Sequence, residues 1–197
     1  VVPSSEVSRV RAKYDLPERF LLTVGTIEPR KNLTRLVEAL ARLRKADRQL
    51  YLVVVGSKGW MFDEFFAKIE ELGLQGAVRM LGFVPDEDLP AVFRAATVYV
   101  MASIYEGAGL PLLEAMACGV PVVSSRESSL PELGADVPRY FNPYDVDNMT
   151  EVLRQVLDDE ALRAHMASQG PVRAGRFSWQ RAARETLDVY TRTLRGQ

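Results

Sequence analysis

Cysteine and histidine each occur only once among the 197 residues, as Cys118 and His165. A lone cysteine cannot form an internal disulfide, so the sequence predicts a reducing, cytoplasmic setting. No Cys/His cluster or carboxylate pair has metal-ligand spacing, and no Ser-His-Asp set is recognisable, so we expect no metal site and no serine-hydrolase chemistry. We interpret Cys118 as a core residue and His165 as a surface residue of a helix.

The chain also lacks an excess of charge and any long apolar run. Its 25 basic and 26 acidic residues leave a net charge of -1, which provides no positive field for a nucleic acid, so we expect no nucleic-acid partner. No apolar run approaches the roughly 20 residues of a membrane-spanning helix, and no charged-then-apolar leader is present. The 47% hydrophobic and 26% charged residues are typical of a soluble globular protein.

Six short apolar, β-rich runs are present, and most alternate with stretches of helical periodicity. The expected strands are Phe20 to Val24, Leu50 to Val55, Val78 to Leu81, Thr97 to Met101, Val120 to Ser124 and Arg139 to Phe141. This order predicts an α/β fold with a Rossmann-like, doubly wound parallel sheet. In such sheets the ligand lies beyond the carboxyl ends of the strands, where the loops gather.

The two ends of the chain differ from this repeating pattern. Residues 1–18 are expected to be an irregular or weakly helical lead-in from a missing N-terminal domain, because the chain begins Val-Val-Pro without an initiator methionine. Residues 19–175 are expected to form one ligand-binding domain. Residues 176–197 then form a separate closing segment, in which Ser178 caps a helix that runs through Arg195.

The stretch from Ser103 to Gly119 carries the clearest functional pattern, a strand, a glycine-bearing loop and a helix start. Gly107 and Gly109 allow a ligand to approach the backbone closely, and Pro111 suits the first turn of a helix. The unpaired amides at that helix start form an anion site. Two carboxylates, Glu106 and Glu114, bracket it and would repel a bare phosphate. A nucleotide sugar, with hydroxyls at both ends and a diphosphate between them, fits this arrangement.

The run Glu106 to Val123, E-G-A-G-L-P-L-L-E-A-M-A-C-G-V-P-V-V, closely resembles the E-x7-E signature of retaining GT-B glycosyltransferases. The resemblance implies that the chain is one half of a GT-B fold, the C-terminal donor-binding domain. The whole protein would transfer a hexose from a nucleotide-diphosphate sugar to an acceptor hydroxyl, without a metal or other cofactor. A glycan or lipid-linked acceptor would bind to the missing N-terminal domain. Ala108 stands where many members have Phe, which alters the packing beside the sugar pocket.

The resemblance also assigns roles to charged residues. Glu114 would accept hydrogen bonds from the ribose hydroxyls, and Glu106 would contact sugar hydroxyls or support developing positive charge. Lys31 and Arg30 would neutralise the diphosphate together with the amides of Gly109 and Leu110. The alternative for the two cations is a solvated position at a helix N-terminus, where their charge is slightly unfavourable.

Further donor-binding residues are expected on the same rim of the sheet. They are Gly107, Gly109, Leu110, Pro111, Thr26, Gly56, Lys58, Gly82, Phe83 and Val84. For Gly56, Lys58 and the Gly82 to Val84 run, turn glycines with a core aromatic remain an equal alternative. By resemblance, the backbone of Gly82 to Val84 would meet the nucleobase. The loop from Ser125 to Glu132 is another candidate.

Three other functions stay open from the sequence. They are a nucleotide-sugar epimerase of the same fold, a non-catalytic sugar-nucleotide-binding module, and a flavodoxin-like or response-regulator-like domain. The run Glu28-Pro29-Arg30-Lys31-Asn32 favours GDP-mannose-like donors in bacterial polysaccharide or O-antigen assembly. Peripheral association of the whole protein with the inner face of the membrane also stays open.

Overall fold

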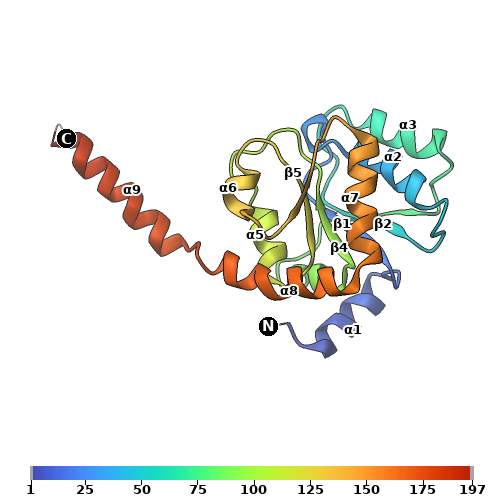
Figure 1. Ribbon diagram of the computed structural model, residues 1–197, viewed down its shortest axis with the longest axis horizontal. Coiled ribbons are helices and arrows are strands. Elements are labelled where there is room, and N and C mark those ends of the chain that lie inside the picture. The colour runs from blue at the N-terminus through green and yellow to red at the C-terminus, as the bar shows by residue number, and fades with distance from the viewer. Residues whose placement is uncertain (1, 196–197) are drawn as a thin grey trace.

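A computed structural model describes residues 2–195, and its centre is a six-stranded, all-parallel sheet (Figure 1). The strands are β1 (Phe20–Val24), β2 (Tyr51–Val55), β3 (Val78–Gly82), β4 (Val98–Met101), β5 (Val122–Ser125) and β6 (Arg139–Phe141). Their order in the sheet is β3-β2-β1-β4-β5-β6. The predicted strands and the predicted α/β class are confirmed, with strand bounds that differ by at most two residues.

The sheet reverses its winding direction between β1 and β4. From β1 the chain proceeds outward through β2 to β3, and it then returns to pair β4 with β1, where Leu21 lies opposite Val98. A reversal of this kind separates the loops that follow the two central strands and opens a crevice at the carboxyl edge. The loops after β1 and β4 are therefore the natural walls of a ligand site.

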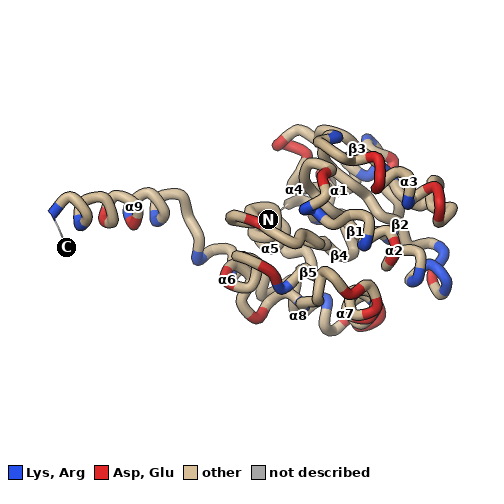
Figure 2. The backbone as a smooth tube through the Cα atoms, turned by 90° about the horizontal axis from the view of Figure 1, so that it is seen from above, with Lys and Arg blue, Asp and Glu red and all other residues tan. Residues whose placement is uncertain are grey.

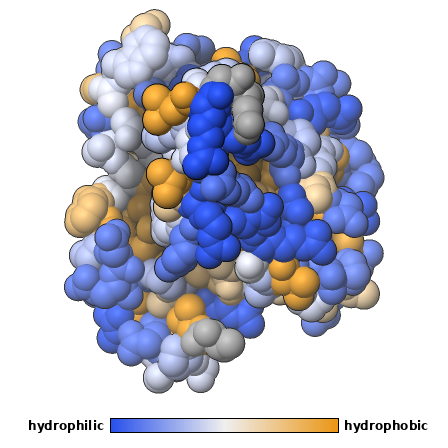
Figure 3. Space-filling model, turned by 90° about the vertical axis from the view of Figure 1, so that its left-hand side faces the viewer, coloured by the Kyte–Doolittle hydropathy of each residue, from blue (hydrophilic) through white to orange (hydrophobic). Residues whose placement is uncertain are grey.

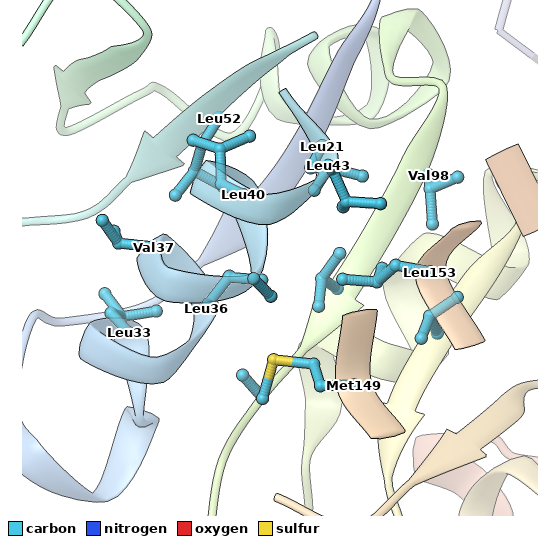
Figure 4. Close-up of a cluster of buried hydrophobic side chains, with 14 of the residues drawn as sticks. Leu21, Leu33, Leu36, Val37, Leu40, Leu43, Leu52, Val98, Met149 and Leu153 are labelled. Atoms are coloured by element: carbon cyan, nitrogen blue, oxygen red, sulfur yellow. The ribbon is translucent and has the colours of Figure 1, made fainter. Parts of the chain in front are cut away.

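Helices cover both faces of the sheet. Successive side chains of each inner strand point to opposite faces, and because nearly all of them are apolar, both faces must be buried. Leu52 packs with one core cluster and Val53 with the other. The first cluster (Figure 4) is completed chiefly by α2 (Leu33–Leu43), α3 (Asp63–Glu71) and α7 (Val146–Asp158). The second is completed by α1 (Ser4–Lys13), α4 (Leu89–Ala95), α5 (Leu110–Ala117) and α6 (Leu130–Gly134). Both faces being buried explains the near-continuous apolar runs of the strands.

Helix α8 (Glu160–Ala174) crosses one end of the sheet and packs closely against α5 (Figure 1). At their crossing, a Cβ added to Gly170 would lie 2.7 Å from the carbonyl oxygen of Met116. Any larger residue at position 170 would therefore push the two helices apart. This contact fixes the back of α5, whose other end begins at the predicted anion site.

The structure specifies two local features that the sequence left open or does not show. Of the two alternatives for the first 18 residues, irregular or weakly helical, the structure has a regular helix over residues 4–13, α1, which packs on α4. Asparagine is a common helix cap, which predicts that Asn32 caps the helix that follows it, but its side chain makes no capping hydrogen bond to α2. Its backbone is left-handed (φ 57°), and its Nδ2 donates to the carbonyl oxygens of Ala102 (3.1 Å) and Pro143 (2.8 Å). Buried Asn32 thus joins three loops at the carboxyl edge.

Two helices begin later than the sequence pattern predicts. The pattern predicts helices that begin at Trp60 and at Asp86, whereas α3 begins at Asp63 and α4 begins at Leu89. In both cases the preceding residues belong to the loop at the carboxyl edge of the sheet. The rim connections are consequently longer than the periodicity predicts.

Helix α9 (Trp179–Leu194) extends away from the rest of the structure (Figure 1). Ser178 caps it as expected, by accepting a hydrogen bond from the amide of Arg181 at 3.2 Å. None of its residues is buried, and acidic and basic residues intermingle along it (Figure 2). Seen from the side on which α9 lies, the surface of the molecule is mainly hydrophilic, with hydrophobic side chains in separate spots (Figure 3). Across residues 2–195, no helix has the length and apolarity needed to cross a membrane.

Candidate functional site

Glu106 is the centre of a charged cluster at the crevice between β1 and β4. One carboxylate oxygen accepts from Lys31 Nζ at 2.6 Å and from Ser103 Oγ at 2.7 Å. The other oxygen accepts from Arg30 Nη1 at 2.8 Å. The structure therefore brings together the three predicted catalytic residues, two from the β1 loop and one from the β4 loop.

Burial and hydrogen bonding act in opposite directions on Glu106. The residue is 8% exposed, and burial alone would raise the pKa of its carboxyl group. The hydrogen bonds from Lys31 and Ser103, with the charge of Lys31 and the contact from Arg30, outweigh burial and lower the pKa below its usual value. Glu106 is thus a carboxylate at neutral pH. Both cations already have an anionic partner in the absence of ligand.

A second carboxylate, Glu28, holds Arg30 from the other side. Arg30 Nε lies 2.6 Å from one Glu28 oxygen, and the indole Nε1 of Trp60 donates to the other oxygen at 3.0 Å. The backbone also fixes Arg30, because its carbonyl oxygen accepts from the amide of Ile104 at 2.9 Å. The guanidinium is therefore positioned between two acids, although its side chain is 40% exposed.

The loop of residues 107–110 has backbone N–H groups with no hydrogen-bond partner among residues 2–195. Gly109, which precedes α5, has a left-handed backbone (φ 62°) that favours glycine. A Cβ there would lie 2.6 Å from Leu130 Cδ2, so the Leu130 side chain would have to shift to admit a larger residue. At Gly107, by contrast, a Cβ would meet no atom within 4 Å. Free amides, the α5 N-terminus and open space together form an arrangement that can accept an anion.

Glu114 lies one turn into α5 and outside the Glu106 cluster. Burial, with a smaller effect from the negative charge of Asp86, raises the pKa of its carboxyl group. No cation is among the causes of this shift, so the Glu114 carboxyl group is available to accept hydrogen bonds from a ligand. Pro111, at the start of the same helix, has no N–H to leave unpaired, as its predicted position requires.

Several other predicted donor-binding residues have structural roles or face elsewhere. A Cβ on Gly56 would overlap the carbonyl oxygen of Gly25, so this glycine is required by packing between two loops. Lys58 Nζ lies 5.0 Å from the ring centroid of Phe62 and 4.7 Å from that of Phe66. These cation–π contacts place Lys58 on the aromatic side chains next to α3, and no recorded contact joins it to Glu106.

The remaining predicted residues lie at the rim. Thr26 is exposed, and its methyl group lies against Gly59 of the neighbouring loop. Gly82 has a left-handed backbone (φ 68°), Phe83 is 80% exposed, and the side chain of Val84 is only 3% exposed. The alternative reading of Phe83 as a core aromatic is wrong. Leu110, at 43% exposure, also faces outward.

Sequence reasoning missed the polar residues that support this cluster. Ser103, Glu28 and Trp60 had no assigned role, although their places beside strand ends and next to charged residues were visible. Asp88 was also missed: it is 1% exposed and accepts from Arg9, Lys13 and Tyr14 of the α1 region at 2.6 Å each. These three donors lower the pKa of Asp88.

Cys118 and His165 have no place in this cluster. Cys118 is partly buried beside the second core cluster, as expected, and burial raises the pKa of its thiol. His165 is exposed on α8. Between residues 2 and 195, no three His, Cys, Asp or Glu side chains are grouped so that they could hold a metal ion.

Comparison with known proteins shows the family of this chain. Residues 5–173 match the family model described as "Glycosyl transferases group 1". The chain is 40% identical to O-antigen chain mannosyltransferase B of Escherichia coli over 188 residues, 94% of this chain and 49% of that protein. It is 36% identical to the MMP alpha-(1->4)-mannosyltransferase of Mycolicibacterium hassiacum over 181 residues, 89% of this chain and 43% of the relative.

Among solved structures, the sucrose-phosphate synthase of Thermosynechococcus elongatus superposes with a TM-score of 0.83 at 28% identity. The superposition covers 96% of this chain and 49% of that one. The chain thus spans about half the length of these relatives, as expected for one half of a GT-B protein. Because the family model covers most of its length and the parallel sheet matches, this chain belongs to the group 1 glycosyl transferases.

Proposed function

We propose that this chain is the donor-binding half of a retaining glycosyltransferase that uses a nucleotide-diphosphate sugar. One observation carries the proposal: Glu106, hydrogen-bonded to Lys31 and Arg30, is followed directly by four backbone amides that have no partner among residues 2–195. This arrangement offers a carboxylate for sugar hydroxyls beside cations and amides for phosphate oxygens. It occupies the crevice where ligands of doubly wound sheets bind.

The diphosphate would be held by residues of both walls. The charges of Glu28, Glu106, Arg30 and Lys31 sum to zero, so the ion pairs alone give no net attraction for an anion. The free amides of residues 107–110 and the N-terminus of α5 supply the additional attraction. Lys31, whose side chain is 11% exposed, is close enough to the surface to turn from Glu106 towards a phosphate.

Glu114 and Glu106 would bind the two hydroxyl-bearing ends of the donor. Within residues 2–195, no cation is paired with Glu114 to compete with a ribose hydroxyl, and Glu106 lies next to the open space at Gly107. Thr26, Gly82, Phe83 and Val84 complete the rim for the rest of the nucleotide. Gly56 supports the rim through its packing on Gly25, and Lys58 through its contacts with the aromatic side chains next to α3.

In the proposed transfer, the bond between the sugar C1 and the diphosphate oxygen breaks, and its electron pair goes to the diphosphate. The acceptor oxygen forms its bond to C1 on the same face, and its proton passes to the departing diphosphate, which is the nearest base there. Lys31, Arg30 and the amides of Gly109 and Leu110 stabilise the leaving negative charge, so the step needs no metal ion or other cofactor.

The relatives support a hexose donor of the mannose class, because two of them are named as mannosyltransferases. We extend this to transfer onto a glycan or lipid-linked acceptor in polysaccharide assembly. The acceptor would bind to a second domain. This chain covers only 49% of the Escherichia coli mannosyltransferase, so the remaining half of that relative is long enough to form such a domain. The 197-residue chain by itself is then expected to bind donor without transferring sugar.

The direct test is titration of this chain with GDP, UDP, ADP and dTDP, with and without magnesium, followed by backbone amide NMR. We expect one nucleotide to shift the amides of residues 107–114 and of Lys31 without magnesium. Lys31→Ala should weaken that binding about tenfold or more, since a charge-assisted contact contributes about 1.5–3 kcal/mol. The matched control is Lys45→Ala, an exposed lysine beyond the end of α2. Equal affinity of the Lys31 variant and the control would remove Lys31 from the site.

A further inference from the structure

Two serines of the connection between β5 and α6, Ser128 and Ser129, hold the backbone of Glu106 on both sides of its Cα. The Glu106 N–H donates to Ser128 Oγ at 2.9 Å, and Ser129 Oγ donates to the Glu106 carbonyl oxygen at 3.0 Å. We call this pair the serine clamp. We infer that the serine clamp positions the Glu106 carboxylate for the sugar of the donor, an inference that rests on the proposed function.

Ser129 is used in an unusual way. It occupies the N-cap position of α6, where a serine hydroxyl ordinarily accepts from an amide of the first helical turn. No such bond is present on Ser129, and its hydroxyl instead donates to Glu106, 23 positions earlier in the chain. The hydroxyl therefore acts on the β4 loop and not on its own helix.

Ser128 adopts a backbone conformation that serine rarely takes. Its φ is 51°, in the left-handed region where a residue with a Cβ is strained. Such strain persists where the surroundings fix the conformation, and it gathers at functional sites. Here the conformation is the one in which the hydroxyl oxygen accepts from the Glu106 amide.

The same connection touches the glycine loop at a second point. Leu130, the residue after the clamp, fills the space that a Cβ on Gly109 would need. Residues 128–130 thus contact the loop after β4 at Glu106, just before the free amides, and at Gly109, which carries one of them. The connection between β5 and α6 therefore holds the loop that would bind the donor in one conformation.

The carboxylate end is held independently of the clamp. Ser103 Oγ donates to the Glu106 carboxylate, and Ser125 Oγ at the end of β5 donates to the Ser103 carbonyl oxygen at 2.6 Å. With the clamp on the backbone and Ser103 on the side chain, both ends of Glu106 are fixed before ligand arrives. Because Glu106 is already ordered, less conformational entropy is lost when a ligand binds to it.

The first test needs no nucleotide. Ser128→Gly removes the acceptor and relieves the left-handed backbone, whereas Ser128→Asn keeps an acceptor oxygen and tolerates that backbone. We expect faster hydrogen exchange of the Glu106 amide in Ser128→Gly and wild-type protection in Ser128→Asn. Unchanged protection of that amide in Ser128→Gly would overturn the clamp, whether or not a nucleotide binds.

The second test separates positioning from stability. The affinity of the chain for a nucleotide sugar is divided by its affinity for the matching nucleoside diphosphate, with GDP-mannose and GDP as the first pair. This ratio reports the contact with the sugar. We expect Ser128→Gly and Ser129→Ala to lower the ratio about three- to tenfold, the effect of one hydrogen bond. Ser128→Asn should restore it.

The control is Ser168→Ala on α8, whose hydroxyl bonds only within the helix: it donates to the carbonyl oxygen of His165 and accepts from Gln169 Nε2. In the whole protein, the clamp variants should lower the turnover number more than they alter the Michaelis constant for donor. Wild-type ratios in both clamp variants would refute the inference. Failure of the wild-type chain to bind any nucleotide would refute the proposed function instead, and the exchange test would still decide whether the clamp holds Glu106.

Discussion

The ion pairs of Glu106 predict that removing its charge will strengthen nucleotide binding, although Glu106 belongs to the proposed active site. In the ligand-free structure Lys31 and Arg30 are committed to this carboxylate at 2.6 and 2.8 Å. A diphosphate must share these cations with Glu106 or displace it. Glu106→Gln keeps the shape and the polar atoms of the side chain but releases both cations for the ligand.

The size of the effect follows from distance and burial. A carboxylate and a phosphate about 5 Å apart repel by about 3 kcal/mol at the effective dielectric constant of about 20 found near protein surfaces. Because Lys31 and Arg30 are partly exposed, screening by solvent reduces this value. We expect about 1.5 kcal/mol, which corresponds to roughly tenfold tighter binding of the nucleoside diphosphate.

Titration calorimetry with the nucleoside diphosphate measures this gain, and Glu70→Gln, an exposed acid on α3, is the matched control. The gain should be absent for the sugar nucleotide, because the same substitution weakens the contact with the sugar hydroxyls. Transfer by the whole protein should fall. Weaker binding of the nucleoside diphosphate to Glu106→Gln than to the control would show that the carboxylate does not compete for the cations, and the reasoning would be refuted.

Four other substitutions have outcomes set by the structure. Gly109→Ala should lower the free energy of unfolding by about 1–3 kcal/mol in urea titrations, because the backbone of Gly109 is left-handed and a Cβ there would overlap Leu130. Gly107→Ala should leave the free energy of unfolding unchanged and weaken donor binding, because a Cβ there meets no atom of residues 2–195 within 4 Å. Glu114→Gln should raise the free energy of unfolding at pH 7, because burial disfavours the charged carboxyl; its nucleotide affinity should decrease. The gain in stability should fade as the pH falls through the raised folded pKa and be absent below about 4.3, the unfolded pKa. Asp88→Asn should be less stable than wild type at pH 7, because the contacts of Asp88 lower its folded pKa and so stabilise the charged carboxylate. The difference in the free energy of unfolding should shrink only below about pH 4, the unfolded pKa. Urea titrations at pH 7, 5 and 3.5 would measure it.

The strands of the sheet could be predicted from the sequence because a strand that is buried on both faces consists almost entirely of apolar residues. The inner strands are continuous apolar runs, and the glycines that follow them mark where each strand ends. The convergence of the β1 and β4 loops, and with it the pairing of Glu106 with Lys31 and Arg30, was recoverable from two facts. One is that ligands gather at the carboxyl edge, and the other is the resemblance of the two loops to one family.

What the sequence could not supply were contacts that depend on the path of a loop. Asn32 has the residue type of a helix cap, but its left-handed backbone turns the side chain towards two carbonyl oxygens instead. Lys58 follows a strand like Lys31 does, yet it lies on aromatic rings. The bond from Ser129 to Glu106 joins residues 23 positions apart through a connection without periodicity. Local pattern carries no information about such pairs.

The hydrogen bonds of Asp88 join the start of the chain to the rim of the site as one mechanical unit. Three side chains from the α1 region hold Asp88, and the amide of Asp88 bonds back to Pro85 in the connection that also carries Phe83. The carboxylate of Asp88 therefore links α1 to the connection that carries Phe83, and loss of its three side-chain contacts should loosen both segments together.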